Sequence, residues 1–228
     1  MEIHYKGIAH ERTEDAPFIG ALVCAMDCEF NCYDCFNQHL RDVETPFYVN
    51  TAEEIVAKIK ENPFNEGILL AGLEWSLQPL ELVELASVAS KAGLQVMIYT
   101  GNSLLDFQRI IGQSCAKKYG MSDEIEKNIV SENDSGIYAF MGGMILDTLI
   151  NAPYYIKCGR YDETKRVYDR VQFGVQLASE NQTIYKFMTD VEDKDYGKNK
   201  ESGNLNGVRY NGKPAGGNRA KRRKHRGK

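Results

Sequence analysis

Apolar and polar positions along the chain predict strands that alternate with helices. Short apolar runs typical of strands occupy residues 18–23, 67–72, 94–100 and 152–157, and a weaker pattern covers residues 3–8. A strand, a helix and a second strand at this spacing make a βαβ unit, which requires parallel pairing. The pattern therefore predicts an α/β fold built on a parallel sheet.

The helices between these runs have recognisable ends. Thr51 and Glu54 give a capping-box pattern, and the helix that follows stops before Pro63. A second helix opens at Pro79 and ends at Gly93, and a third covers residues 103–111. The side chains expected to be buried on the first two helices are Ile55, Val56, Ile59, Leu80, Val83, Leu85 or Ala86, and Ala89.

Three cysteines directly follow the first apolar run. Cys28, Cys32 and Cys35 form a Cys-x3-Cys-x2-Cys pattern on the loop that leaves the carboxyl end of the predicted strand. Ligands of α/β folds bind at that edge of the sheet, and close thiolates suit a soft metal centre. Because a four-iron cluster has four corners, three cysteines leave one iron open to a small molecule.

A structural zinc site is the alternative for these thiols. Structural zinc usually takes four ligands arranged as two pairs. Cys24 is a candidate fourth ligand, but it falls inside or at the end of the apolar run, while Cys115 and Cys158 are isolated. The spacing therefore favours an iron–sulfur cluster over zinc.

The three-cysteine pattern after a first strand resembles the signature of the radical S-adenosylmethionine (SAM) enzymes. The resemblance implies a partial (β/α) barrel, a [4Fe-4S] cluster held by Cys28, Cys32 and Cys35, and SAM on the fourth iron. In that family one electron from the cluster cleaves SAM to methionine and a 5′-deoxyadenosyl radical, which takes a hydrogen atom from the substrate. A flavodoxin- or ferredoxin-type protein is the expected electron donor.

The segment after the second predicted strand is similar to the Gly-Gly-Glu/Asp-Pro motif of that family. Gly72 and Glu74 match its first glycine and its acid, whereas Leu73 and Trp75 replace the second glycine and the proline. The resemblance implies that Gly72, Leu73 and Glu74 meet the amino group of SAM. From the residues alone, Glu74 is also compatible with a solvated loop carboxylate.

Three further residues are candidates for cofactor binding. The resemblance places Asp34 and Phe36, which flank the last cysteine, near the nucleoside of SAM, and it adds Thr100 at the end of the third strand. An ordinary core position is the alternative for Phe36.

Four short motifs occur in the same order as in the activating proteins of the anaerobic ribonucleotide reductases, and the chain resembles these proteins in that respect. The motifs are Phe36-Asn37, Thr100-Gly101, Gly159-Arg160-Tyr161 and Asn181-Gln182, after which residues 183–187 would form a last strand. The resemblance implies a glycyl-radical enzyme activase whose partner is an anaerobic ribonucleoside-triphosphate reductase.

Two other functions stay open. One is a radical SAM enzyme that acts on a small molecule, similar to 7-carboxy-7-deazaguanine synthase. The other is a non-catalytic metal-binding module, for which Leu73, Trp75 and Cys158 are the evidence, since Cys158 stands where the activases carry Asp.

Length and composition indicate a single domain followed by a tail. Its 228 residues, 43% of them hydrophobic, suffice for one α/β domain, predicted over residues 1–192 with an insertion at 112–143. No apolar stretch approaches a membrane span, and no signal-peptide pattern is present. Clustered cysteines in a chain of this length do not fit a secreted disulfide framework, so a cytoplasmic location is expected.

Residues 193–228 are predicted to form a disordered basic tail. Residues 198–228 carry eleven Lys or Arg and one acidic residue, so the remainder holds a charge of −14 within a chain total of −4. Such a tail could bind an acidic partner or nucleic acid. The alternative is a solvated, disordered end that has no partner. There is no phosphate-binding loop or folded nucleic-acid motif elsewhere in the sequence.

Overall fold

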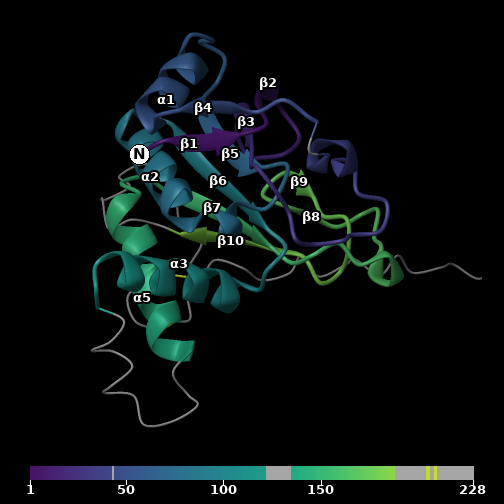
Figure 1. The fold of residues 1–228 in the computed structure, drawn as a ribbon. Coiled ribbons are helices and arrows are strands. Elements are labelled where there is room, and N and C mark those ends of the chain that lie inside the picture. The colour runs from purple at the N-terminus through teal and green to yellow at the C-terminus, as the bar shows by residue number, and fades with distance from the viewer. Residues whose placement is uncertain (43, 122–134, 188–203, 206–207, 210–228) are drawn as a thin grey trace, which may run out of the picture.

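A mixed six-stranded sheet forms the centre of the protein. The computed structural model describes residues 1–42, 44–121, 135–187, 204–205 and 208–209 (Figure 1). The strands of the sheet follow the order β10-β7-β6-β5-β3-β2. Their bounds are Gly7–Arg12 for β2, Gly20–Cys24 for β3, Gly67–Ala71 for β5, Gln95–Thr100 for β6, Tyr154–Cys158 for β7 and Thr183–Phe187 for β10.

The four central strands run parallel, as the sequence predicts. Cys24 pairs with Ala71 at the end of β3 and β5, and Thr100 pairs with Cys158 at the end of β6 and β7. These carboxyl ends therefore share one edge of the sheet. The edge strands differ, because β2 is antiparallel to β3 and β10 is antiparallel to β7. The result is an open mixed sheet, and the radical SAM barrel stays a prediction.

Helices α1, α2, α3 and α5 cover one face of this sheet (Figure 1). The capping box of Thr51 and Glu54 begins α1, and Gly93, at a positive φ of 85°, follows the C-cap of α2. Both ends are confirmed, and so is the burial of Ile55, Val56 and Ile59, whereas Leu80 is only partly buried. The helix bounds are Ala52–Lys60 for α1, Pro79–Lys91 for α2, Leu104–Lys118 for α3 and Ser135–Leu149 for α5.

Helix α3 is longer than its apolar pattern indicates. It begins at the Ser103 cap but continues past residue 111 to Lys118, because Cys115 and Ala116 add a further buried turn. The predicted insertion at 112–143 thus comprises the end of α3, residues 122–134 outside the described part, and the first half of α5. A Cβ on Gly142 of α5 would lie 1.8 Å from the Gln108 carbonyl oxygen of α3. Only glycine permits this approach of the two helices.

Loops and a hairpin cover the opposite face of the sheet, where the described residues include no α-helix. Residues 13–18 and a short hairpin of β8 (Val171–Gln172) and β9 (Val175–Gln176) lie over it (Figure 1). The buried cluster on this face consists of Ala16, Phe18, Leu69, Met97, Tyr155, Val175, Leu177 and Ile184. This face is therefore closed over its middle by apolar side chains of the same chain.

The remaining elements are short. Besides the β8–β9 hairpin, the described residues form two further antiparallel pairs outside the main sheet: β1 (Ile3–Tyr5) with β4 (Tyr48–Asn50), and β11 (Asn204–Leu205) with β12 (Val208–Arg209). The rest of the predicted basic tail, like residues 188–192 just before it, lies outside the described residues. The short 3-10 helices are η1 (Gln38–Arg41), η2 (Trp75–Leu77) and η4 (Glu163–Lys165).

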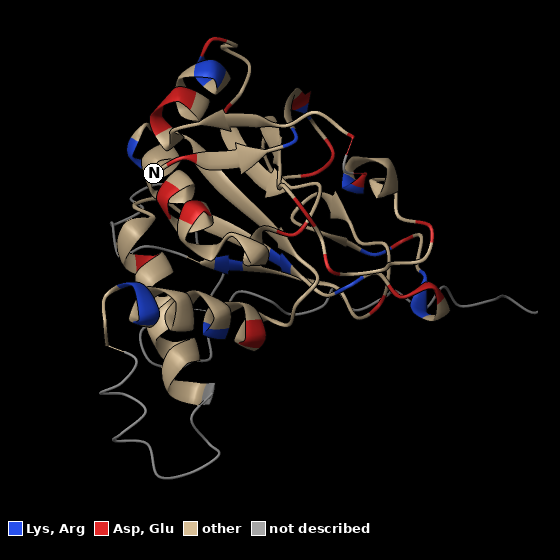
Figure 2. Cartoon of the chain, in the orientation of Figure 1, with Lys and Arg blue, Asp and Glu red and all other residues tan. Residues whose placement is uncertain are grey.

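Within the described residues, no helix has both the length and the apolar character needed to cross a membrane. Acidic positions are spread over the helices and loops, and basic positions include the adjacent strands β7 and β10 (Figure 2).

Candidate metal centre

The three motif cysteines lie on the loop between β3 and η1. Cys28, Cys32 and Cys35 are free thiols, and each is partly exposed. The strand ends at Cys24 and the loop leaves at the carboxyl edge of the sheet, as predicted. Among the residues described, no three His, Cys, Asp or Glu side chains are arranged to hold a metal ion. The thiols thus share one loop but are not gathered at one point.

Contacts from distant strand ends hold this loop over the sheet edge. The Phe30 ring lies against Gly101, where an added Cβ would come within 2.5 Å of it. Arg160 donates to the carbonyl oxygen of Asn31 at 2.9 Å, and Arg41 donates to that of Phe30 at 3.2 Å. The loop therefore rests on the residues that follow β6 and β7.

The end of the loop is joined to the residue after β5. Asn37 donates from Nδ2 to the Gly72 carbonyl oxygen at 2.7 Å. Gly72 has a φ of 83°, and a Cβ there would lie 2.4 Å from the Cys24 sulfur. Glycine is therefore required at this position for both backbone conformation and space.

Glu74 is a buried, fully engaged carboxylate. Its side chain accepts hydrogen bonds from the Ser76 backbone at 3.0 Å, the Thr100 hydroxyl at 2.9 Å and the Gly101 backbone at 2.8 Å. The residue is 3% exposed, so the alternative of a solvated loop carboxylate is wrong. Charge-assisted bonds of this kind are among the stronger ones in proteins, so Glu74 joins the carboxyl ends of β5 and β6.

Neighbours of Glu74 belong to the core. Leu73 is buried, and Trp75 is fully buried with its Nε1 donating to the Val23 carbonyl oxygen at 3.1 Å. Leu73 and Trp75, which stand where the family motif has its second glycine and its proline, are therefore core residues, and Trp75 is bonded to β3. Asn102 extends the polar network by donating to the hydroxyls of Ser76 and Thr100, at 2.9 and 3.0 Å.

Asp34 and Phe36 stand on the outer side of the loop. Asp34 adopts a left-handed φ of 55°. Phe36 is 94% exposed, so the core alternative for this ring is wrong. An aromatic ring in full contact with water loses the stabilisation of burial, which a flat ligand stacked on it would restore.

The other three cysteines are buried and chemically different. Burial raises the pKa of Cys24 to about 11, and burial together with the Glu74 charge raises the pKa of Cys158 to about 12. Burial also raises the pKa of Cys115. Cys158 is almost fully buried, with 4% of its surface exposed. Burial raises the pKa of Cys28 on the loop as well. Because thiolates are the metal-binding form, Cys24 and Cys158, with the highest pKa values, are poor ligands.

Residues 19–121 match the family model of the 4Fe-4S single cluster domain. This 4Fe-4S domain extends from β3 through the cysteine loop to the residues just after α3. A search of curated proteins finds no match to the sequence. The donor set fits the group, since the domain holds three partly exposed thiols on one loop at the carboxyl edge. A 4Fe-4S cluster-binding domain is therefore present, and its ligand residues stay predicted.

The structure brings together two short motifs that are far apart in the sequence, Gly159-Arg160 and Asn181-Gln182. Asn181 donates to the Arg160 carbonyl oxygen at 2.7 Å, and Gln182 donates to that of Gly159 at 3.1 Å. These bonds fix the turn from which Arg160 reaches the cysteine loop. Phe30 and Arg41 are functional candidates that sequence reasoning missed, because their partners are glycine and backbone groups that carry no pattern.

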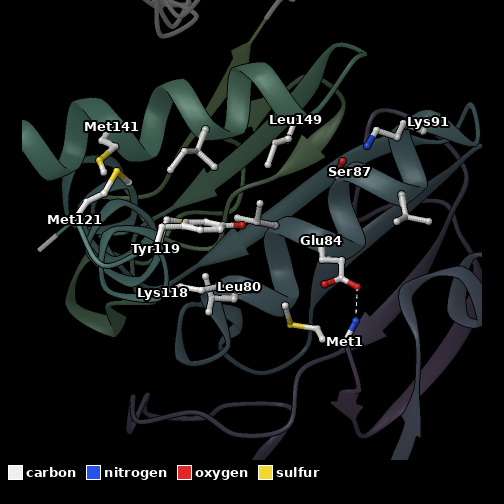
Figure 3. Close-up of a pocket in the computed structure, with 14 residues that line it drawn as sticks. Met1, Leu80, Glu84, Ser87, Lys91, Lys118, Tyr119, Met121, Met141 and Leu149 are labelled. Carbon is white, nitrogen blue, oxygen red and sulfur yellow. Dashed lines mark hydrogen bonds and ion pairs between the residues drawn. The ribbon is translucent and has the colours of Figure 1, made fainter.

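A separate pocket of about 510 Å³ lies on the helical side (Figure 3). It opens among α2, α3, α5 and Met1, and the terminal ammonium of Met1 pairs with Glu84 at 2.7 Å. Its lining is mainly apolar, and none of its lining residues comes from the cysteine loop. The pocket is therefore unrelated to the candidate metal centre.

Proposed function

We propose that the protein is a radical SAM enzyme in which Cys28, Cys32 and Cys35 ligate three irons of the 4Fe-4S cluster. One observation carries the proposal: the cysteine loop is hydrogen-bonded through Asn37 to Gly72, beside Glu74, at the carboxyl ends of parallel strands. When bound, the cluster would supply the electron that cleaves SAM. The chain's own residues would hold the loop in position and exclude water and oxygen.

The residues next to the loop have distinct parts in this proposal. Gly72 and Leu73 would offer backbone groups to the amino acid end of SAM, and Glu74 would orient that segment through its bonds to Thr100 and Gly101. Asp34 and the exposed Phe36 would face the nucleoside. Burial of a flat ring against Phe36 would contribute to binding by removing apolar surface from water.

Within this class we propose an activase that installs a glycyl radical on an anaerobic ribonucleotide reductase. The meeting of Gly159-Arg160 with Asn181-Gln182 supports it, because these marks form one hydrogen-bonded unit beside the loop. A flavodoxin- or ferredoxin-type protein would deliver the electron. The basic tail would contact an acidic partner surface or nucleic acid.

A radical SAM enzyme acting on a small molecule is the second candidate. The closed apolar face around Phe18, Val175 and Leu177 favours it, since a large partner has no open side of the sheet to enter there. The two candidates separate by substrate: the activase yields a glycyl-radical EPR signal on a purified reductase, and the other yields none.

The deciding experiment for SAM chemistry is anaerobic reconstitution with iron and sulfide, then reduction with dithionite and assay of 5′-deoxyadenosine. We expect product from the wild type and from a Cys115→Ala control, and none from Cys32→Ala. A bound cluster without product in the wild type would instead support a non-catalytic cluster module. Retained zinc without a cluster would refute the proposal.

A further inference from the structure

Lys157 is a cation in an unusual place. It lies near the end of β7, where its backbone pairs with Tyr99 of β6 and Ile184 of β10. Side chains alternate between the two faces of a strand. Since Tyr155 and Ile184 belong to the apolar cluster, Lys157 lies on that same closed face, away from the helices.

The ammonium of Lys157 has an aromatic neighbour in place of an anionic one. Its Nζ lies 4.6 Å from the centre of the Tyr99 ring, and the Tyr99 hydroxyl donates to the Asp15 carbonyl oxygen. In the described part of the chain, no carboxylate comes within 4.0 Å of this ammonium. Burial lowers the pKa of Lys157 to about 8, and the charge of Asp15 opposes that effect.

The carboxylate whose charge acts on this lysine also interacts with a second cation. Asp15 is also paired with Arg12 of β2 at 2.7 Å, so its carboxylate is shared between Arg12 and Lys157. Lys186 of β10 lies on the same face, diagonal to Lys157, with its Nζ 5.7 Å from the Tyr155 ring centre. A half-buried ammonium with no carboxylate within 4.0 Å among the described residues is costly, and an anion placed beside it would relieve that cost.

Position links this cation to the candidate metal centre. Lys157 precedes Cys158, the last residue of β7, and the following turn carries Arg160, which donates to the cysteine loop. Lys157 and Arg160 are three positions apart in the sequence, and Gly159, at a positive φ of 105°, forms the turn between them. The apolar cluster includes Tyr155, two residues before Lys157, so Lys157 lies nearer than Tyr155 to the carboxyl edge of the sheet.

We propose that Lys157, on the floor formed with Tyr99, binds an oxyanion of the substrate, a carboxylate or a phosphate, at the edge of the sheet below the cysteine loop. The assignment of this anion to the substrate rests on the proposed radical SAM function. Lys157 positions the substrate in this scheme and takes no part in bond breaking.

The test is an NMR titration of the full chain labelled with ¹³C-lysine, with the Lys157 resonance assigned by its loss in Lys157→Arg. Inorganic phosphate, acetate and methionine are added in separate samples, with sodium chloride at matched ionic strength as the control. We expect phosphate or acetate to raise the pKa of Lys157 by about one unit or more, since a nearby opposite charge favours the charged form. An Asp15→Asn variant should bind the same anion more tightly.

Two results would overturn the inference. One is a Lys157 pKa that neither phosphate nor acetate moves beyond the chloride control. The other is a shift caused by methionine alone, which would assign the lysine to the amino acid end of SAM. Neither depends on SAM cleavage, so failure of the 5′-deoxyadenosine assay is distinguishable from failure of this site.

Discussion

Asn37 donates a hydrogen bond from its side-chain amide to the carbonyl oxygen of Gly72, with Nδ2 and O 2.7 Å apart. The bond joins the end of the cysteine loop to the residue that follows β5. Glu74, two residues further, accepts from Thr100 and Gly101 at the end of β6. Through this chain of contacts, the loop is positioned by two parallel strands.

Replacing Asn37 by Ala should loosen the cysteine loop while leaving the fold intact. One lost hydrogen bond costs about 1 kcal/mol. Hydrogen exchange at residues 28–36 should become faster, and a reconstituted cluster should lose its iron to a chelator sooner. Asn31→Ala is the matched control, because only the Asn31 carbonyl contacts Arg160 and the substitution keeps it. Equal iron loss in both variants would contradict the role of the Asn37 bond.

Glu74→Gln should destabilise the protein more than a surface replacement does. Three donors point at the carboxylate, and a glutamine amide would present its own N–H groups to one of them. We expect the free energy of unfolding in urea to fall by about 2 kcal/mol. The exposed Glu180→Gln control should change it by less than about 0.5 kcal/mol. A Glu74→Gln variant as stable as the control would show that the network contributes little.

Two glycines of α5 should respond in opposite ways to the same substitution. Gly142→Ala places a Cβ 1.8 Å from the Gln108 carbonyl oxygen, so α3 and α5 must separate. Overpacking of this kind costs about 1–3 kcal/mol. At Gly136 an added Cβ meets nothing within 4 Å, and alanine there should keep or slightly raise the stability. Thermal unfolding of the two variants measures the contrast, and similar midpoints would show that the helices do not approach as described.

The six cysteines should divide into two groups on alkylation of the native protein. At about pH 8 the loop thiols Cys28, Cys32 and Cys35 should react with iodoacetamide, because they are accessible. Cys24, Cys115 and Cys158 should stay unmodified, because all three are buried and burial raises their pKa, to about 11 for Cys24 and about 12 for Cys158. Raising the pH toward these values should increase their reaction, because a larger fraction becomes thiolate.

The alkylation experiment is repeated after the protein has been reconstituted with iron and sulfide. Mass spectrometry after reconstitution should show protection of the three loop thiols, and urea should expose all six. Protection of Cys24 in place of one loop thiol would reassign the ligand set.

The sequence by itself determined the elements and the chemistry of the loop. Apolar runs, the Thr51–Glu54 capping box and the glycine after α2 mark the strands and helix ends that the structure confirms. These signals are local, since they depend on neighbouring residues alone. The Cys-x3-Cys-x2-Cys spacing is local as well, and the family match over residues 19–121 supports its interpretation as a 4Fe-4S domain.

Only the tertiary structure decided what surrounds that loop. Glu74 bonds to Thr100, Phe30 contacts Gly101 and Arg160 reaches Asn31, and each of these contacts joins residues far apart in the sequence. The exposure of Phe36 is likewise a property of the folded chain. The extension of α3 past residue 111 follows from the burial of Cys115 and Ala116. Lys157 likewise gains its lowered pKa from apolar neighbours on three strands. Such properties depend on long-range packing and desolvation, which one-dimensional patterns do not encode.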